Sequence, residues 1–460
     1  MPRRLLIALL CLAGLAAPAH AQSVPTDAAQ MRLSFAPIVK KAGPAVVNVY
    51  SRRVVRQQVD PFFQMFGGGM GLSRERIAQS LGSGVIVRPD GVIVTNNHVI
   101  EGGQDIMVVL GDRREFPAKV LLADPHADVA VLKIDAGAER LPVLPLAAGD
   151  QAQVGDLVLA IGDPFGLGQT VTNGIVSALA RSNVGVTDVS YFIQTDAAIN
   201  PGNSGGALVD MNGQMIGMNT AILSQSGTSS GVGFAIPAAL VRHVVDEAIG
   251  GGVQARTWLG LKTQGVTAEI ARSMGLDRPD GVLITDVWPG GPADEAGLKP
   301  GDLILTLDGE PVNDEASLNY HVLTRNSGDA VTVQYRRGKG EPQSARLRMA
   351  PIPASPARDE RTLTGRNPLG GATVANLSPA VADEMGLDPF AAGHGVLITK
   401  VEAGYAASVG LRPGDLIVQV NGHSPTSVAG LQALLDAPAG SGWTLVIQRG
   451  GQTITAQFRL

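Results

Sequence analysis

Ser204 lies in a glycine-rich segment whose residue types could support acyl transfer, Asn200-Pro201-Gly202-Asn203-Ser204-Gly205-Gly206. A serine attacks a carbonyl carbon only if a base removes its proton, and the oxyanion that forms needs preorganised N–H donors. Glycines around the serine let the N–H groups of Gly202 and Ser204 point at one spot, so we assign Gly202, Asn203 and Ser204 to an oxyanion hole. Because such runs are as common in surface turns, the assignment requires a base and an acid elsewhere.

Two histidines precede this segment and are natural partners for Ser204, His98 and His126. His98 follows the apolar run Val92-Ile93-Val94, and the end of a strand can hold a side chain rigidly. His126 lies in a polar turn, Asp124-Pro125-His126-Ala127, which is typical of a solvated loop histidine. We therefore predict that His98 is the base.

Asp128 directly precedes another apolar run, Val129-Ala130-Val131-Leu132. A carboxylate at the buried edge of a strand is costly unless it is hydrogen-bonded. An imidazole N–H offsets that cost, and the carboxylate fixes the tautomer of the ring. We predict a catalytic triad of His98, Asp128 and Ser204, whose order along the chain is that of the chymotrypsin architecture.

The elements that must position these residues are mainly strands. Short β-branched runs broken by turn dipeptides fill residues 28–249 and are typical of an all-β sandwich or barrel. Pro237 stands at the first turn of one clear helix, which we predict to run to about Ile249 because Gly250-Gly251-Gly252 follows.

One stretch of this region, from Gln57 to Ser80, has no such periodicity. It contains four glycines and the aromatic residues Phe62, Phe63 and Phe66. We expect a mobile loop with exposed hydrophobic side chains, which could regulate a neighbouring active site by inserting into it.

The second half of the chain contains an internal repeat. Gly281-Val282-Leu283-Ile284-Thr285 recurs as Gly395-Val396-Leu397-Ile398-Thr399, and Gly297-Leu298-Lys299-Pro300-Gly301-Asp302 recurs as Gly410-Leu411-Arg412-Pro413-Gly414-Asp415. A proline-rich segment separates the two copies and has the composition of a linker. We predict one domain at 22–252, a first copy of the repeat at 256–349, a linker at 350–365 and a second copy at 366–460.

The overall composition fits about three globular domains, because the chain has 460 residues of which 45% are hydrophobic. Charged residues make up 17% of the chain, and the net charge is −5. No block of lysine and arginine has the character of a nucleic-acid footprint, so a nucleic-acid partner is not expected. A stable membrane span is not expected either, because only the N-terminus approaches the required apolar length.

The N-terminus has the three parts of a secretory signal. Arg3 and Arg4 precede an apolar stretch from Leu5 to Ala17, and Ala19-His20-Ala21 fits the cleavage site. We predict a signal peptide at 1–21 that is removed on export to the periplasm, the uncleaved alternative being an N-terminal anchor. Cleavage would also remove Cys11, the single cysteine, so disulfides and thiolate metal sites are not expected. No cofactor is expected.

Three blocks resemble the catalytic segments of the Do/HtrA family of exported serine endoproteases: Thr95-Asn96-Asn97-His98-Val99, Asp128-Val129-Ala130-Val131-Leu132 and Gly202-Asn203-Ser204-Gly205-Gly206. The resemblance covers nearly the whole chain after the signal. It implies a mainly β protein, with a chymotrypsin-like double β-barrel protease followed by two PDZ domains, which are small α+β barrels. It also implies homotrimers that assemble into larger cages, and degradation of misfolded or damaged envelope proteins in the stress response.

The segment Thr220-Ala221-Ile222-Leu223-Ser224 lies where a chymotrypsin-like chain pairs with substrate and shapes the specificity pocket. It contains no carboxylate that would bind a basic side chain, and Ile222 suggests a shallow apolar pocket. We expect cleavage after small aliphatic residues.

PDZ domains capture peptide C-termini by adding them as a strand while loop N–H groups receive the carboxylate. Trp258-Leu259-Gly260-Leu261 fits that loop in the first copy, and Ser317 to Thr324 is a candidate for the helix along the groove. The second copy has Leu369-Gly370-Gly371-Ala372, which implies a weaker or different site. The expected partners are unfolded or misfolded proteins and their C-terminal peptides.

Two other classes of protein share several of these features. One is a chaperone or peptide-binding scaffold with an idle triad, and the other is a PDZ-gated signalling protease that cuts one substrate. The intact triad disfavours the first, and the two PDZ domains behind a cleavable signal disfavour the second.

Overall fold

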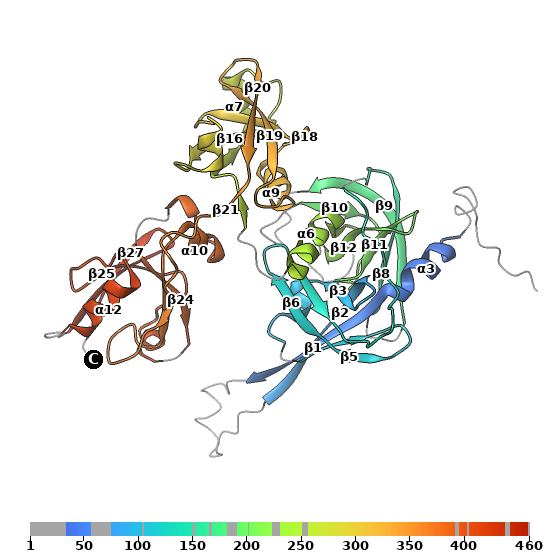
Figure 1. Cartoon of the computed structure of the whole chain (residues 1–460), viewed down its shortest axis with the longest axis horizontal. Coiled ribbons are helices and arrows are strands. Elements are labelled where there is room, and N and C mark those ends of the chain that lie inside the picture. The colour runs from blue at the N-terminus through green and yellow to red at the C-terminus, as the bar shows by residue number, and fades with distance from the viewer. Residues whose placement is uncertain are drawn as a thin grey trace, which may run out of the picture. The chain divides into compact units, whose positions relative to one another are not determined.

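A computed structural model describes residues 34–56, 75–103, 105–149, 152–164, 168–181, 191–200, 202–222, 231–250, 256–391, 395–402, 404–437 and 442–458. The chain divides into two compact units, Met1–Gly251 and Gly252–Leu460, which Figure 1 colours from blue to red along the sequence. The predicted signal peptide and the aromatic part of the predicted loop, residues 57–74, lie outside the described residues.

The first part of the first unit is an antiparallel sheet with the order β5-β4-β1-β2-β3-β7-β6. The apolar runs before His98 and after Asp128 form the neighbouring strands β3 and β7, and Thr95 pairs with Ala130. This register brings the end of β3 beside the start of β7. The strands are β1 (Val46–Arg56), β2 (Glu75–Arg88), β3 (Val92–Thr95), β4 (Asp105–Val109), β5 (Glu115–Pro117), β6 (Lys119–Asp124) and β7 (Val129–Lys133).

The expectation of a loop from Gln57 to Ser80 is wrong for its last part. Residues 75–80 belong to β2, where Glu75 pairs with Arg56 and Ser80 with Ser51 of β1. Pairing with a distant strand specifies this part of β2, and the local sequence carries no apolar periodicity that would reveal it.

The second part of the first unit is a closed barrel with the order β10-β13-β12-β11-β8-β9. Its strands are β8 (Leu157–Gly162), β9 (Thr170–Arg181), β10 (Phe192–Thr195), β11 (Ala207–Asp210), β12 (Met215–Ile222) and β13 (Gly233–Pro237). Among the described residues, helical elements accompany the sheet and the barrel at α3 (Ala36–Ala42), η1 (Gly43–Ala45), α5 (Asn97–Ile100) and α6 (Ala238–Ile249).

Helix α6 confirms the helix predicted after Pro237, which is its N-cap residue. It contacts β6 and β7 of the sheet as well as β12 and β13 of the barrel. Arg242 donates hydrogen bonds to the carbonyl oxygens of Leu146 at 2.8 Å and Ala147 at 2.7 Å, in the segment that joins the two parts. The helix therefore fastens the sheet to the barrel.

The second unit contains two copies of one sheet-and-helix arrangement, as the internal repeat predicts. In the first copy the sheet order is β15-β16-β17-β19-β20, with β18 beside β17, and β14 pairs with β21. Strand β15 lies at an edge of its sheet. The elements are β14 (Thr257–Trp258), β15 (Leu261–Gly265), α7 (Ala268–Met274), β16 (Val282–Val287), α8 (Pro292–Glu295), β17 (Asp302–Leu307), β18 (Glu310–Pro311), α9 (Glu315–Leu323), β19 (Ala330–Arg337), β20 (Pro342–Arg348) and β21 (Ala350–Pro351).

The second copy has the sheet order β22-β23-β24-β25-β26-β27. Strand β23 corresponds to β15 of the first copy, but β22 occupies the edge beside it. The elements are β22 (Arg361–Thr362), β23 (Ala372–Asn376), α10 (Pro379–Glu384), η3 (Pro389–Ala391), β24 (Val396–Val401), α11 (Tyr405–Ser408), β25 (Leu416–Val420), α12 (Val428–Asp436), β26 (Trp443–Arg449) and β27 (Gln452–Phe458).

The same ion pair stabilises both copies. Arg337 contacts the buried Asp302 at 2.7 Å, and Arg449 contacts the buried Asp415 at 2.6 Å. The hydrogen bonds that the two arginines donate to these carboxylates raise the pKa of both arginines. Equivalent positions of the repeat therefore share one charge-assisted contact, which confirms that the two copies are structurally related.

Candidate active site and peptide-binding surfaces

His98 and Asp128 come from neighbouring strand ends in the first unit and meet as predicted. Nδ1 of His98 lies 2.9 Å from Oδ2 and 3.0 Å from Oδ1 of Asp128. The backbone N–H of His98 also donates to Oδ1 at 3.0 Å. The side chain of Asp128 is only 7% exposed, whereas that of His98 is 48% exposed. The acid is thus buried behind the ring, and the ring can reach a substrate.

Asp128 adopts a left-handed backbone conformation, with φ of 53°. Aspartate tolerates this conformation better than most residues. The carbonyl oxygen of Asp128 accepts hydrogen bonds from the backbone of Asn97 at 3.2 Å and from the side chain of Asn96 at 3.0 Å. These contacts hold the turn that directs the carboxylate toward His98.

Ser204 belongs to the segment before β11 and is held against the first sheet. Its carbonyl oxygen accepts the N–H of Ser83 at 2.8 Å. At the next position Gly205 has φ of 84°, and a Cβ there would lie 2.1 Å from the carbonyl oxygen of Ser83. Only glycine therefore allows the Ser204 loop to approach this closely.

The hydroxyl of Ser204 donates to the carbonyl oxygen of Thr220 at 3.0 Å. Within the described residues it makes no hydrogen bond to His98. The Thr220 hydroxyl in turn donates to Oδ2 of Asp128 at 2.8 Å, and Thr220 is 3% exposed. The structure therefore links Ser204, Thr220, Asp128 and His98 in one hydrogen-bonded chain.

The three residues predicted for the oxyanion hole differ in their backbone contacts. The N–H of Asn203 donates to the carbonyl oxygen of Asn200 at 3.0 Å. Among the described residues, the N–H groups of Gly202 and Ser204 make no hydrogen bond. These two groups are therefore the donors that remain for an oxyanion.

The other residues of the predicted substrate-binding segment are described only in part. Thr220, Ala221 and Ile222 lie in β12, and Leu223 and Ser224 lie outside the described residues. Thr220 was predicted to bind substrate, but its side chain donates to Asp128, the predicted acid of the triad. No sequence signal distinguishes these two roles, because both require only a polar residue near the serine.

Asp163 is a buried carboxylate close to the Ser204 loop. It was not among the predicted site residues. Its N–H donates to the Ser83 hydroxyl at 2.8 Å, and that hydroxyl donates to the carbonyl oxygen of Gly202 at 2.6 Å. Its Oδ1 has no hydrogen-bond partner among the described residues. Burial raises the pKa of Asp163, and a hydrogen bond from the backbone of Gly168 partly opposes this.

Asp163→Asn should stabilise the protein at neutral pH. An acid whose pKa is raised by folding favours the protonated form in the native state. The wild type therefore loses stability as the pH rises from the pKa of the unfolded chain through the higher pKa of the folded protein. We expect a gain on the order of 1 kcal/mol at pH 7, since a buried unsatisfied charge costs at least that much. The gain should shrink toward pH 4, near the ordinary pKa of 3.8.

Denaturant unfolding from pH 4 to 8 checks this prediction. Asp105→Asn is the control, because Asp105 is exposed in β4. A stability difference for Asp163→Asn that is absent, or that grows toward acid pH, would show that burial of this carboxylate is not the cause.

In the first copy of the repeat, the predicted carboxylate loop connects β14 to the edge strand β15. Gly260 has φ of 71°, which favours glycine at this position. The carbonyl oxygens of Leu259 and Gly260 accept the N–H groups of Ala293 and Trp288, at 3.0 and 2.9 Å. The helix predicted at Ser317 to Thr324 is present as α9 (Glu315–Leu323), and its first residue, Glu315, accepts a hydrogen bond from the Thr263 hydroxyl of β15 at 3.3 Å.

In the second copy, the N–H groups of the corresponding loop are already used. Leu369 and Gly370 donate to Asn367 Oδ1 at 3.0 Å and Asn367 O at 3.1 Å, Gly371 donates to Leu363 O at 2.9 Å, and Ala372 donates to Leu369 O at 2.9 Å. The backbone N–H groups of this loop are therefore already hydrogen-bonded within the second copy.

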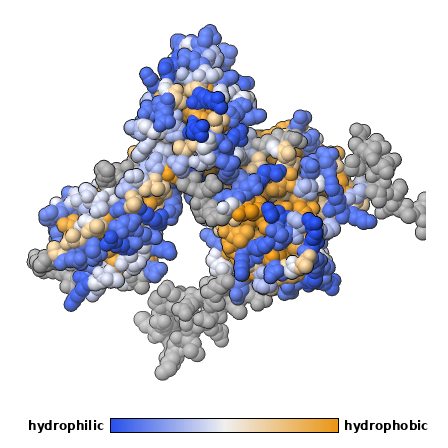
Figure 2. Space-filling view, viewed as in Figure 1, coloured by the Kyte–Doolittle hydropathy of each residue, from blue (hydrophilic) through white to orange (hydrophobic). Residues whose placement is uncertain are grey.

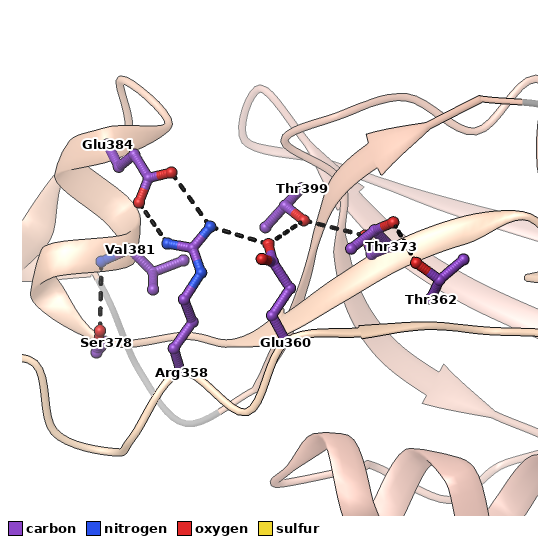
Figure 3. A network of polar contacts seen from close by, with 8 residues as sticks. All are labelled: Arg358, Glu360, Thr362, Thr373, Ser378, Val381, Glu384 and Thr399. Atoms are coloured by element: carbon purple, nitrogen blue, oxygen red, sulfur yellow. Dashed lines mark hydrogen bonds and ion pairs between the residues drawn. The ribbon is translucent and has the colours of Figure 1, made fainter. Parts of the chain in front are cut away.

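The segment before β22 also lies along the second copy, as Figure 3 shows. Arg358 contacts Glu384 at 3.1 Å and Glu360 at 2.9 Å, and Glu360 accepts the Thr399 hydroxyl at 3.0 Å. The hydrogen bond that Arg358 donates to Glu360 lowers the pKa of that carboxyl group. The second copy thus covers the edge of β23 with its own linker.

The comparisons with known proteins agree with the order of these parts. Residues 82–218 match the trypsin-like peptidase domain family, and residues 258–348 and 397–449 each match a PDZ domain family. The fold and the site thus define a trypsin-like serine endopeptidase followed by two PDZ domains.

Individual relatives cover nearly the whole chain. A probable periplasmic serine endoprotease DegP-like from Marinomonas sp. is 38% identical, over 96% of this chain and 95% of its own length. The periplasmic serine endoprotease DegP of Escherichia coli is 37% identical, over 97% of this chain and 96% of its own. The solved structure of the HtrA-type protease AlgW with decapeptide is 42% identical, with a TM-score of 0.53, and covers 70% of this chain and 99% of that chain. The chain belongs to the Do/HtrA family of serine endoproteases, as its motifs predicted.

Proposed function

We propose that the protein cleaves peptide bonds through an acyl-enzyme formed on Ser204. His98 takes the proton of the Ser204 hydroxyl, Oγ attacks the scissile carbonyl carbon, and Asp128 holds the ring and stabilises its charged form. The N–H groups of Gly202 and Ser204 bind the oxyanion, and water then releases the acyl group with His98 again acting as base. The hydrogen-bonded chain from Ser204 through Thr220 and Asp128 to His98 supports this assignment.

A rotation of the serine hydroxyl must precede the chemistry. In this structure it donates to Thr220, so it must turn toward Nε2 of His98 when a substrate occupies the site. The acid and the base are already paired and need no such change.

Substrates are proposed to carry a small aliphatic residue such as Val, Ile or Ala before the cleaved bond. Residues 220–224 contain no carboxylate to attract a basic side chain, and they include Ile222. In a peptide library, aliphatic residues should be preferred over Arg and Lys by at least about tenfold in kcat/KM. Dominant cleavage after Arg or Lys would contradict the proposal.

The first PDZ domain is proposed to capture the C-termini of unfolded or misfolded proteins. It presents the loop Trp258-Leu259-Gly260-Leu261 beside the open edge of β15. The second PDZ domain is proposed not to bind in this way. The N–H groups of its loop already donate to its own residues, and β22 already pairs with the edge of β23. The proposed domain limits are 22–252, 256–349 and 366–460, with the linker between the PDZ domains at 350–365.

We further propose that the mature protein is periplasmic, after cleavage of residues 1–21, and that it forms trimers that build larger cages. Figure 2 shows hydrophobic surface on the first unit, and the exposed hydrophobic residues of that unit include Val120, Leu121, Val154 and Leu157. Exposed apolar surface of this kind is typical of association sites. Within the described residues, no helix has the length and apolar character needed to cross a membrane.

The proposed function is tested by comparing wild type with Ser204→Ala in three measurements. These are the degradation of β-casein, the molecular mass and the suppression of aggregation. Wild type should degrade casein, and both proteins should have the mass of a trimer or a multiple of it. Equal degradation by both proteins would refute the catalytic assignment, and a monomeric mass would refute the assembly. A variant that loses cleavage but still prevents aggregation would establish the chaperone function beside the protease.

A further inference from the structure

Alternate residues around the carboxylate loop of the first PDZ domain contact the second PDZ domain. Arg256 pairs with Asp383 at 3.0 Å, and Lys262 pairs with Asp388. Between them, the ring of Trp258 lies 5.7 Å from that of Phe390 in an edge-to-face arrangement. All of these residues belong to the second unit of the chain.

In the strands β14 and β15, on either side of Gly260, successive side chains point to opposite faces. Arg256, Trp258 and Lys262 lie on the face that meets the second PDZ domain. Leu259 and Leu261 lie on the other face and join the core of the first PDZ domain. The contact is therefore made on the outer face of the loop, and the open edge of β15 is left to receive a peptide strand.

Phe390 also contacts Trp288, which is hydrogen-bonded to the glycine of the loop. Its ring lies 5.7 Å from that of Trp288, and the two tryptophan rings lie 5.5 Å apart. The N–H of Trp288 donates to the carbonyl oxygen of Gly260 at 2.9 Å. Phe390 thus completes an aromatic cluster that includes both the first residue of the loop, Trp258, and the residue bonded to its glycine, Trp288.

The linker is bonded at both ends, which favours this arrangement. Strand β21 pairs with β14 of the first PDZ domain, and the N–H of Ile352 donates to the carbonyl oxygen of Arg256 at 2.9 Å. On the other side, Pro353 accepts the N–H of Ala380 at 3.0 Å, and Arg358 contacts Glu384. The helix α10 and the segment with Phe390 follow β23 in the second PDZ domain.

We propose that Phe390 of the second PDZ domain is a positioning residue for the peptide site of the first, so that the two domains bind one peptide as a single unit. Edge-to-face packing against Trp258 and Trp288 restrains the loop whose N–H groups receive the carboxylate. The ion pairs of Arg256 and Lys262 are partly exposed and orient the contact rather than supplying most of its strength. This inference rests on the proposed peptide capture by the first PDZ domain.

The test measures binding of a fluorescein-labelled decapeptide with a free C-terminal valine to the full chain carrying Ser204→Ala, which prevents cleavage. A decapeptide with an amidated C-terminus controls for the carboxylate. Adding Phe390→Ala should weaken binding of the free peptide by about five- to tenfold, a typical size for coupling between sites. Phe390→Trp should restore most of the affinity. Leu387→Ala, at an exposed position of the same segment, should leave it unchanged.

A charge exchange gives a second, independent measurement. Lys262→Glu and Asp388→Lys should each weaken binding, and the double variant Lys262→Glu/Asp388→Lys should recover part of the loss. Melting curves for all variants establish that the domains remain folded.

Each outcome bears on one of the two proposals. If the parent chain binds the free and amidated peptides equally or not at all, the proposed capture by the first PDZ domain fails, and this inference fails with it. If the parent binds the free peptide selectively while Phe390→Ala binds it equally well or more tightly, capture stands and the positioning role of Phe390 is wrong.

Discussion

Ser204→Ala is expected to lower kcat for peptide hydrolysis by about a millionfold, because loss of a triad nucleophile removes the covalent route altogether. The side chain makes one hydrogen bond in the resting structure, to the carbonyl oxygen of Thr220. The backbone contacts that hold the loop, from Ser83 to the Ser204 carbonyl oxygen and from Gly205 to Asn219, do not involve the hydroxyl. The variant should therefore fold normally.

Turnover of a chromogenic peptide and labelling by a fluorophosphonate measure the loss. Ser344→Ala is the matched control, since Ser344 is exposed in β20 and should keep full activity. Residual turnover within a factor of ten of the wild type would mean that another residue is the nucleophile.

Asp128→Asn is expected to lower kcat by about ten-thousandfold, the size of effect that follows when a triad histidine is held in the wrong tautomer. The amide can offer an N–H where His98 needs an acceptor, so the proton of the ring moves to the nitrogen that should accept from Ser204. Asparagine is the appropriate replacement because it tolerates the left-handed backbone of position 128, with φ of 53°. Strain in the turn should therefore not obscure the chemical effect.

Thr220→Val provides the comparison for this variant. It removes the hydroxyl that donates to Oδ2 of Asp128 at 2.8 Å but keeps the carbonyl oxygen that accepts from Ser204. Its effect should be far smaller, about tenfold in kcat, because the acid keeps its charge. Steady-state kinetics with one peptide substrate rank the two variants. If Thr220→Val lowered kcat as much as Asp128→Asn, the hydrogen bond that holds the Asp128 carboxylate would matter more for catalysis than the charge of that carboxylate.

Much of the site could be predicted because its parts carry local signals. His98 and Asp128 each adjoin an apolar strand, and the glycines around Ser204 indicate a tight turn. Once β3 and β7 are neighbours, Thr95 pairs with Ala130, and the side chains of His98 and Asp128 must lie close together. The repeated Gly-Leu-x-Pro-Gly-Asp motif likewise predicted two copies of one domain.

Contacts between distant segments could not be predicted in this way. The partner of Thr220 is Asp128, which lies 92 residues away, and nothing in residues 220–224 indicates it. The residues around Asp163, Gly162 and Pro164, do not indicate burial, although the fold makes Asp163 a buried carboxylate. The strand at residues 75–80 depends on pairing with β1, and the aromatic cluster of Phe390 depends on how two domains meet.

The proposed triad is divided between two parts of the fold, which affects when a newly made chain can become active. His98 and Asp128 belong to the sheet that ends with β7, whereas Ser204 and Thr220 belong to the barrel that begins with β8. Because the chain is synthesised from its N-terminus, the base and the acid are made before the nucleophile. A chain in which the barrel has not docked on the sheet lacks a complete set of these residues, so such a chain cannot cleave its neighbours by this route.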